Sequence, residues 1–289
     1  ILSGLVGSEM CIRDSAYAAQ IVQGPDRRYY LYAPVQQRNA SSADPFGIGV
    51  AVADSPLGPW TDAHPQGPIV SQSVPTPNTI QNIDPTVLVD DDGRVYLYWG
   101  TFGALYGVEL QRDMVSFKGT PVAVDTLGGY FEAPWLFKRK GTYYLAYAAN
   151  NAGRGSACTP TQYHACIAYA SAPTPLGPWT YRGIVLPPVS STTSHPGIVA
   201  FAGQWYLVYH TADAAGGGHF RRSVAIDRLQ WDDGTQPASI RTITPTRRPQ
   251  PPMQPQRNQA PAAYASASNG PDIPCLLYTS DAADDTPCV

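Results

Sequence analysis

The chain has 289 residues and a net charge of −3, and 14% of its residues are charged. It contains 26 glycines and 29 prolines, a composition that argues against a coiled coil or helix bundle. Its cations, three lysines and otherwise arginines, are scattered and form no basic stripe of the kind that binds nucleic acid. No apolar segment approaches the roughly 20 residues of a membrane helix, so we expect neither nucleic acid nor a membrane as a partner.

The two ends of the chain differ in composition from its middle. Residues 1–15, ILSGLVGSEMCIRDS, lack the charged start, apolar run and small-residue cleavage site of a secretory signal. We interpret them, and residues 273–289, as foreign ends that resemble adapter read-through. Residues 16–246 are expected to form the folded domain. Residues 247–272 form a Pro-rich linker, in which NQAPAAYASASNG resembles the opening of a carbohydrate-binding module.

A repeat is the strongest feature of the predicted domain. A turn followed by an aromatic-rich strand occurs four times, as DRRYYLYA at 26–33, GRVYLYWG at 93–100, GTYYLAYA at 141–148 and GQWYLVYH at 203–210. Helical periodicity is nearly absent. Short strands with a period of about 50 residues are typical of β-propeller blades. We therefore predict an all-β propeller, and favour it over a β-sandwich because a sandwich does not explain a repeat that returns to one phase.

Equivalent positions of the repeat converge on the propeller axis, so their phase indicates a site. Asp84 and Glu132 each lie 12 residues before the Tyr-Leu pair of their repeat, and His195 lies 11 before its own. The matching residue of the first repeat is Ala18. Two carboxyls across a pocket are what acetal hydrolysis requires. An Asx turn at Asp84 and a strand-edge glutamate at Glu132 are the structural alternatives, but neither predicts a shared phase.

Two further motifs have competing interpretations. Cys158 and Cys166, with seven residues between them, either close a hairpin loop with a disulfide, as in an oxidising compartment, or remain thiols. His164 between them is a weak zinc signal, because no fourth ligand accompanies it. The run at 90–93, Asp-Asp-Asp-Gly, lacks the alternating ligands of a calcium loop, and we predict an ordinary hairpin turn.

The segments IDPTVLVDDDGRVYLYWG, FEAPWLFKRKGTYYLAYA, SHPGIV and FRRSVAIDRL together resemble glycoside hydrolase family 43 over residues 16–246. The resemblance implies a five-bladed propeller that hydrolyses xylosides and arabinosides of hemicellulose with inversion. Invertase-like propellers share the three-acid plan, but carry a cysteine where this chain has Ala133. A non-catalytic carbohydrate-binding propeller is the alternative function, and it gives no reason for two acids in phase.

The resemblance also implies roles for individual residues. Glu132 would be the general acid and Asp84 the group that raises its pKa. The expected substrate-binding residues are Arg222, His195, Tyr17 and Trp135. His195 would also help to hold a structural metal ion near the axis, often calcium, through water. A surface arginine and a core histidine are the structural alternatives for Arg222 and His195.

About four of the five expected blades can be counted, and the absent one is the first. The family's general-base aspartate would then lie upstream of Ala16, and Asp14 cannot replace it because it belongs to the foreign-looking leader. We therefore expect residues 1–289 alone to be inactive. The resemblance implies a monomeric protein, secreted or periplasmic in a bacterium, that requires no cofactor and binds carbohydrate. Xyloside or arabinoside specificity, and attack at a chain end or within it, stay open.

Overall fold

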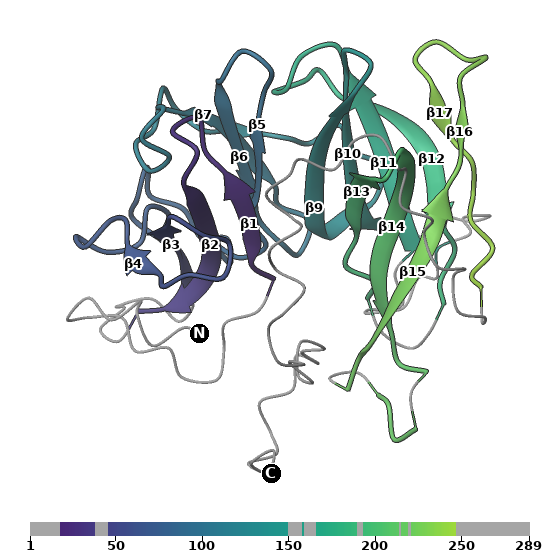
Figure 1. Ribbon diagram of the computed structural model, residues 1–289, viewed down its shortest axis with the longest axis horizontal. Coiled ribbons are helices and arrows are strands. Elements are labelled where there is room, and N and C mark those ends of the chain that lie inside the picture. The colour runs from purple at the N-terminus through teal and green to yellow at the C-terminus, as the bar shows by residue number, and fades with distance from the viewer. Residues whose placement is uncertain are drawn as a thin grey trace, which may run out of the picture.

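The structure, a computed structural model, describes residues 18–37, 46–149, 158, 166–189, 193–213, 215–218 and 221–246. Tyr17, His164 and the predicted leader, linker and tail lie outside this range. Every regular element in the described part of the chain is a β-strand, and no helix there is long and apolar enough to cross a membrane. The strands form four antiparallel sheets that stand side by side as blades (Figure 1), which confirms the predicted all-β propeller.

Each blade is a meander in which sequence neighbours pair. Blade A contains β1 (Gln20–Gln23), β2 (Tyr29–Gln36), β3 (Phe46–Ala53) and β4 (Thr61–Asp62). Blade B contains β5 (Thr86–Val89), β6 (Val95–Trp99), β7 (Tyr106–Leu110) and β8 (Val122–Ala123). Blade C contains β9 (Tyr130–Arg139), β10 (Thr142–Ala149), β11 (Cys166–Ala172) and β12 (Thr180–Leu186). Blade D contains β13 (Gly197–Phe201), β14 (Gln204–Thr211) and β15 (Ser223–Leu229), and a hairpin of β16 (Trp231–Asp232) and β17 (Ser239–Ile240) follows it.

The aromatic segments of the repeat are the second strands of the four blades, and β6 and β10 pack on both faces. In β6, Val95, Leu97 and Trp99 join an apolar layer with blade A, whereas the alternate residues Tyr96 and Tyr98 join a layer with blade C. A third layer lies between blades C and D. Burial on both faces explains why these strands have nearly continuous apolar sequences instead of alternating with polar residues.

The pairing register corrects the predicted equivalence of Asp84 and Glu132. Residues four positions after Asp84 and after Ala133 pair with the equivalent tyrosines of β6 and β10, so Ala133 is the structural counterpart of Asp84. The count along the sequence missed this because five residues separate the paired Val89 and Val95, whereas four separate the equivalent pair Lys138 and Tyr143. Glu132 lies one residue earlier, beside a register shift in β9. His195 does occupy the position equivalent to Asp84.

The inner strands of successive blades are joined by hydrogen bonds from one repeat position. The Gln20 side-chain oxygen accepts from the Val87 N–H, and the Thr86 hydroxyl oxygen accepts from the Leu136 N–H at 3.1 Å. The Trp135 indole N–H donates to the carbonyl of Ile198 at 2.9 Å. The three side chains are equivalent in the pairing register, as are the three backbone partners. Each junction between described blades therefore has one side-chain-to-backbone bond near the axis.

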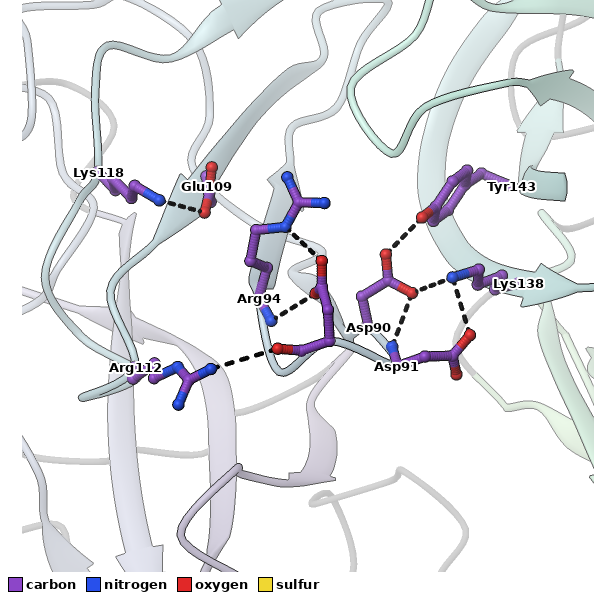
Figure 2. A network of polar contacts seen from close by, with 9 residues as sticks. Asp90, Asp91, Arg94, Glu109, Arg112, Lys118, Lys138 and Tyr143 are labelled. Atoms are coloured by element: carbon purple, nitrogen blue, oxygen red, sulfur yellow. Dashed lines mark hydrogen bonds and ion pairs between the residues drawn. The ribbon is translucent and has the colours of Figure 1, made fainter. Parts of the chain in front are cut away.

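The predicted turn at 90–93 is confirmed as a hairpin turn, and it also connects blades B and C (Figure 2). The buried Asp90 carboxylate accepts hydrogen bonds from the Lys138 ammonium and the Tyr143 hydroxyl, and Asp91 lies 2.9 Å from Lys138. Although burial acts in the opposite direction, these hydrogen bonds lower the pKa of Asp90. Its carboxylate thus serves as an ion-pair partner between blades.

The structure joins Cys158 and Cys166 in a disulfide, with their Cα atoms 5.3 Å apart. Both residues are buried against the layer between blades B and C. The disulfide interpretation of the pair is therefore confirmed over that of two unpaired thiols.

The bond between Thr86 and Leu136 provides a test of the blade junctions. Thr86→Val keeps the side-chain shape but leaves the buried Leu136 N–H without its acceptor, which should cost about 1–3 kcal/mol of unfolding free energy. In a domain of this size each kcal/mol lowers Tm by about 2–4 °C. Thr86→Ser keeps the acceptor and should lose clearly less in the same thermal melts. Equal losses in the two variants would contradict a role for the hydroxyl oxygen.

Candidate active site

Asp84 and Glu132 lie on the neighbouring inner strands of blades B and C. Asp84 precedes β5, and Glu132 is the third residue of β9. The backbone N–H of Ala133 donates to Asp84 Oδ2 at 3.0 Å, so the residue next to Glu132 is held directly on the Asp84 carboxyl. Asp84 is buried, with 3% of its surface exposed. The structure thus brings the two predicted acids together.

The backbone at this point has an unusual conformation. Asp84 has φ +56°, and its counterparts Ala133 and Ala18 have φ +58° and +56°. This left-handed region is uncommon for residues with a Cβ, although aspartate and asparagine adopt it more readily than most. Three blades therefore share one strained approach to the inner strand, and in blade B the residue in that conformation is an acid.

Burial raises the pKa of both carboxyls. It raises the pKa of Asp84 well above its ordinary value, and the negative charge of Glu132 raises it further, against the Ala133 N–H and the Arg222 charge. Burial likewise raises the pKa of Glu132, against hydrogen bonds from Thr193 and Thr101 and the Arg222 charge. Because the two groups interact, they titrate as a pair, and burial favours the protonated form of each. The sequence predicted that the charge of Asp84 raises the pKa of Glu132. In the structure burial is the main cause for both carboxyls, and the like charge raises the pKa of Asp84 instead.

Arg222 and His195 lie near the acid pair. Burial lowers the pKa of the half-buried Arg222 guanidinium, against the charges of Glu132 and Asp84, which act to raise it. Burial and the Arg222 charge lower the pKa of His195 to about 4, so its imidazole is neutral at neutral pH. Four predicted site residues, Asp84, Glu132, Arg222 and His195, thus belong to one electrostatic cluster.

Three residues of the site were not found from the sequence. The Thr101 hydroxyl donates to Glu132 Oε2 at 3.3 Å, and the Thr193 hydroxyl also forms a hydrogen bond with Glu132. Tyr130 is buried beside the acids, whose charges add to burial in raising its pKa. None of the three occupies the repeat position used to find Asp84. The only sequence signal is their closeness to the ends of predicted strands.

Two predicted substrate-binding residues, Trp135 and Tyr17, are not placed in this cluster by the structure. Trp135 is half-buried, and its indole N–H bonds to the backbone of blade D, so the polar edge of the ring is used between blades. A contact of its ring face with sugar stays a prediction. Tyr17 lies outside the described residues.

The predicted calcium ion finds little support in the described residues. Calcium prefers six to eight oxygen ligands. In the described part of the chain, no group of three His, Cys, Asp or Glu side chains could hold a metal. The positive charge of Arg222 also lies close to both acids. These residues do not fit a directly bound cation, and calcium held at His195 through water stays a prediction.

An all-β propeller with a buried carboxyl pair and an arginine at its inner strands has the architecture of a propeller glycosidase. Residues 7–236 match the model of glycosyl hydrolases family 43, a range that overlaps the end of the predicted leader. The chain belongs to glycoside hydrolase family 43.

Relatives and solved structures agree with this assignment. A xylosidase/arabinosidase of Bacteroides ovatus is 31% identical over 252 residues, which cover 72% of this chain and 68% of that protein. An arabinoxylan arabinofuranohydrolase of Bacillus subtilis is 37% identical over 63% of this chain and 40% of its own length. The structure of an α-L-arabinofuranosidase from Clostridium thermocellum superposes with a TM-score of 0.63 and 30% identity, covering 80% of this chain and 73% of that one.

The raised pKa of Asp84 predicts a pH-dependent cost in stability. A carboxyl whose folded pKa exceeds its unfolded value, about 3.9, contributes most stability below that value and loses it as the pH rises. Asp84→Asn keeps the acceptor for Ala133 and tolerates the positive φ. We expect it to raise Tm at pH 7 and to lose this advantage at about pH 4.

Thermal melts across this pH range would measure the effect. Asp125→Asn, which removes the same charge from an exposed loop position, is the control and should not show the trend. A variant no more stable than the native chain at pH 7 would contradict the proposed cost of burying the Asp84 carboxylate.

Proposed function

We propose that this chain hydrolyses xylosidic or arabinosidic bonds of plant cell-wall polysaccharide, with Glu132 as general acid and Asp84 as the group that controls its protonation. One observation carries the proposal: the bond from the Ala133 N–H holds the buried Asp84 carboxyl against the residue next to Glu132, whose carboxyl is half-buried. A carbohydrate-binding propeller would have no need of this arrangement, because a buried carboxyl with a raised pKa lowers stability at neutral pH.

The geometry suits protonation of a leaving-group oxygen. In inverting hydrolysis one carboxylic acid gives its proton to that oxygen while a carboxylate base activates water. Burial raises the pKa of both carboxyls, and the charge of Glu132 raises that of Asp84 further, so the pair favours holding a proton. When Glu132 gives up this proton, the negative charge on the pair grows, and the Arg222 guanidinium stabilises it. Arg222 thus favours the state in which the proton has been transferred.

The substrate class is proposed from the relatives. They include xylosidase/arabinosidases, and a family 43 β-xylosidase/α-arabinofuranosidase from a compost metagenome was solved with xylotriose, with a TM-score of 0.61 and 28% identity. The superposition covers 79% of this chain and 73% of the compost enzyme's chain. We extend pentose-containing substrates to this chain on that basis.

We further propose that the protein works as a single chain in an oxidising compartment, secreted or periplasmic. The four clustered residues Asp84, Glu132, Arg222 and His195 come from one chain, and the Cys158–Cys166 disulfide is of the kind that persists outside the cytoplasm. The position of the general base before Ala16 stays a prediction.

Glu132→Gln tests the acid role through leaving groups. In a version of the chain that carries an additional N-terminal blade from a family member, the variant should lose about 10²–10⁴-fold in kcat/KM on xylosides or arabinosides with poor leaving groups. It should lose far less on activated aryl glycosides, which need little protonation. Glu109→Gln, which alters the acid of a surface ion pair with Lys118, is the matched control and should keep full activity. Equal losses of Glu132→Gln on both substrate classes would contradict the role.

The same rates should be measured on residues 1–289 and on a version that carries an additional N-terminal blade from a family member. We expect turnover from the extended version alone, because inversion needs a base as well as an acid. Comparable turnover by both would show that the base lies within residues 1–289.

A further inference from the structure

The turn Gly100–Ala104, which follows β6 in blade B, is bonded to the start of β9 in blade C. The Tyr130 hydroxyl donates to the Gly100 carbonyl at 2.7 Å, and the Gly103 N–H donates to the Phe131 carbonyl at 3.0 Å. Phe102 and Phe131 pack edge to face, with ring centroids 5.7 Å apart. Two residues in succession are thus held immediately before Glu132.

The same turn is bonded to the segment that carries the other acid. The Gly100 N–H donates to the carbonyl of Ile83, the residue before Asp84, at 2.9 Å. Within the turn, the Ala104 N–H donates to the Thr101 carbonyl at 3.1 Å. Gly100 has φ +134°, and a Cβ there would meet the Ala104 carbonyl oxygen at 2.2 Å, so the close turn requires glycine. The backbone of Thr101 is therefore fixed relative to both acid segments.

Thr101 is 1% exposed, and its hydroxyl donates to Glu132 Oε2 at 3.3 Å. We propose that Thr101 is a positioning residue for the general acid: its hydroxyl, fixed by the Gly100–Ala104 turn, orients the Glu132 carboxyl and thereby the direction in which it presents its proton. This inference rests on the proposed acid role of Glu132. It adds a residue from the neighbouring blade that acts on the reaction only through Glu132.

The surroundings of Glu132 predict the direction of the effect. A hydroxyl that donates to a carboxylate favours the ionised form. Thr101 therefore lowers the pKa of Glu132 against the effect of burial. The other groups that act on the cluster come from different segments and remain in place when Thr101 is changed: Asp84, Tyr130, Thr193, His195 and Arg222.

Thr101→Val removes the donor and keeps the shape, whereas Thr101→Ser keeps the donor. Thr86→Val is the matched control, because it removes a buried threonine hydroxyl that also bonds to β9, four residues beyond Glu132. The chain has only three glutamates, Glu9, Glu109 and Glu132, so selective labelling of glutamate side-chain carboxyls with carbon-13 gives few signals. The spectrum of Glu132→Gln assigns the one of interest.

We expect Thr101→Val to raise the pKa of Glu132 by about half a unit to one unit, the size of one lost hydrogen bond. Thr101→Ser should restore the native titration of Glu132. Thr86→Val should lower Tm but leave the pKa of Glu132 unchanged. No shift in Thr101→Val, or an equal shift in Thr86→Val, overturns the proposal. If Thr101→Val does not fold, Thr101→Ala replaces it, with the same expectation and the same overturning results.

Kinetics separate this inference from the function it rests on. In the version with the additional blade, Thr101→Val should lower kcat on substrates with poor leaving groups about tenfold, which is part of the full contribution of a general acid. The basic limb of its pH profile should move to higher pH, because the pKa of Glu132 rises. Native kinetics in Thr101→Val, beside an impaired Glu132→Gln, would overturn the positioning role alone. Full activity of Glu132→Gln would overturn the acid role and this inference together.

Discussion

Successive blades are fixed to one another where their inner strands meet, by a side chain that bonds to the backbone of the next blade. Gln20, Thr86 and Trp135 occupy one repeat position and serve the three junctions in turn. Apolar layers alone would allow neighbouring sheets to slide, because dispersion and hydrophobic burial are not directional. A hydrogen bond with a defined partner sets the register between inner strands. The bond from Ala133 to Asp84 belongs to the same junction and extends this registration to the acids.

The acid pair lies at the junction between blades B and C, at the inner ends of the two blades. Burying two carboxyls costs stability, and the positive φ of Asp84 and Ala133 adds strain. This cost is offset by aromatic and aliphatic side chains packed on both faces of β6 and β10, and by the outer ion pair of Asp90 with Lys138. Stability comes from the body of the blades, and the unstable chemical arrangement is confined to their inner ends.

The sequence predicted the fold well, because strand periodicity and aromatic turns are local signals that recur in every blade. Phase also found Asp84, Glu132 and His195, yet misassigned one equivalence, because counting from the tyrosine ignores the different lengths of the 90–94 and 139–142 connections. Thr101 was not found from the sequence because it lies in a turn after a strand, outside the repeat position used, and its partner lies 31 residues away. The hydrogen bond of the Trp135 indole could not be predicted. The sequence does not show whether an aromatic residue near a sugar site stacks on the sugar or bonds to a neighbouring blade.

One backbone position shows how a repeated scaffold acquires a single active site. In the four described blades the residues at this position are Ala18, Asp84, Ala133 and His195, and the first three share the same left-handed backbone. A change of side chain there adds chemistry without changing the blade. Glu132 follows a different rule: it precedes this position, and the register shift of β9 places it opposite Ala148. Its neighbour Ala133 packs on Ala148 and donates its N–H to Asp84, so the two acids do not compete for one position.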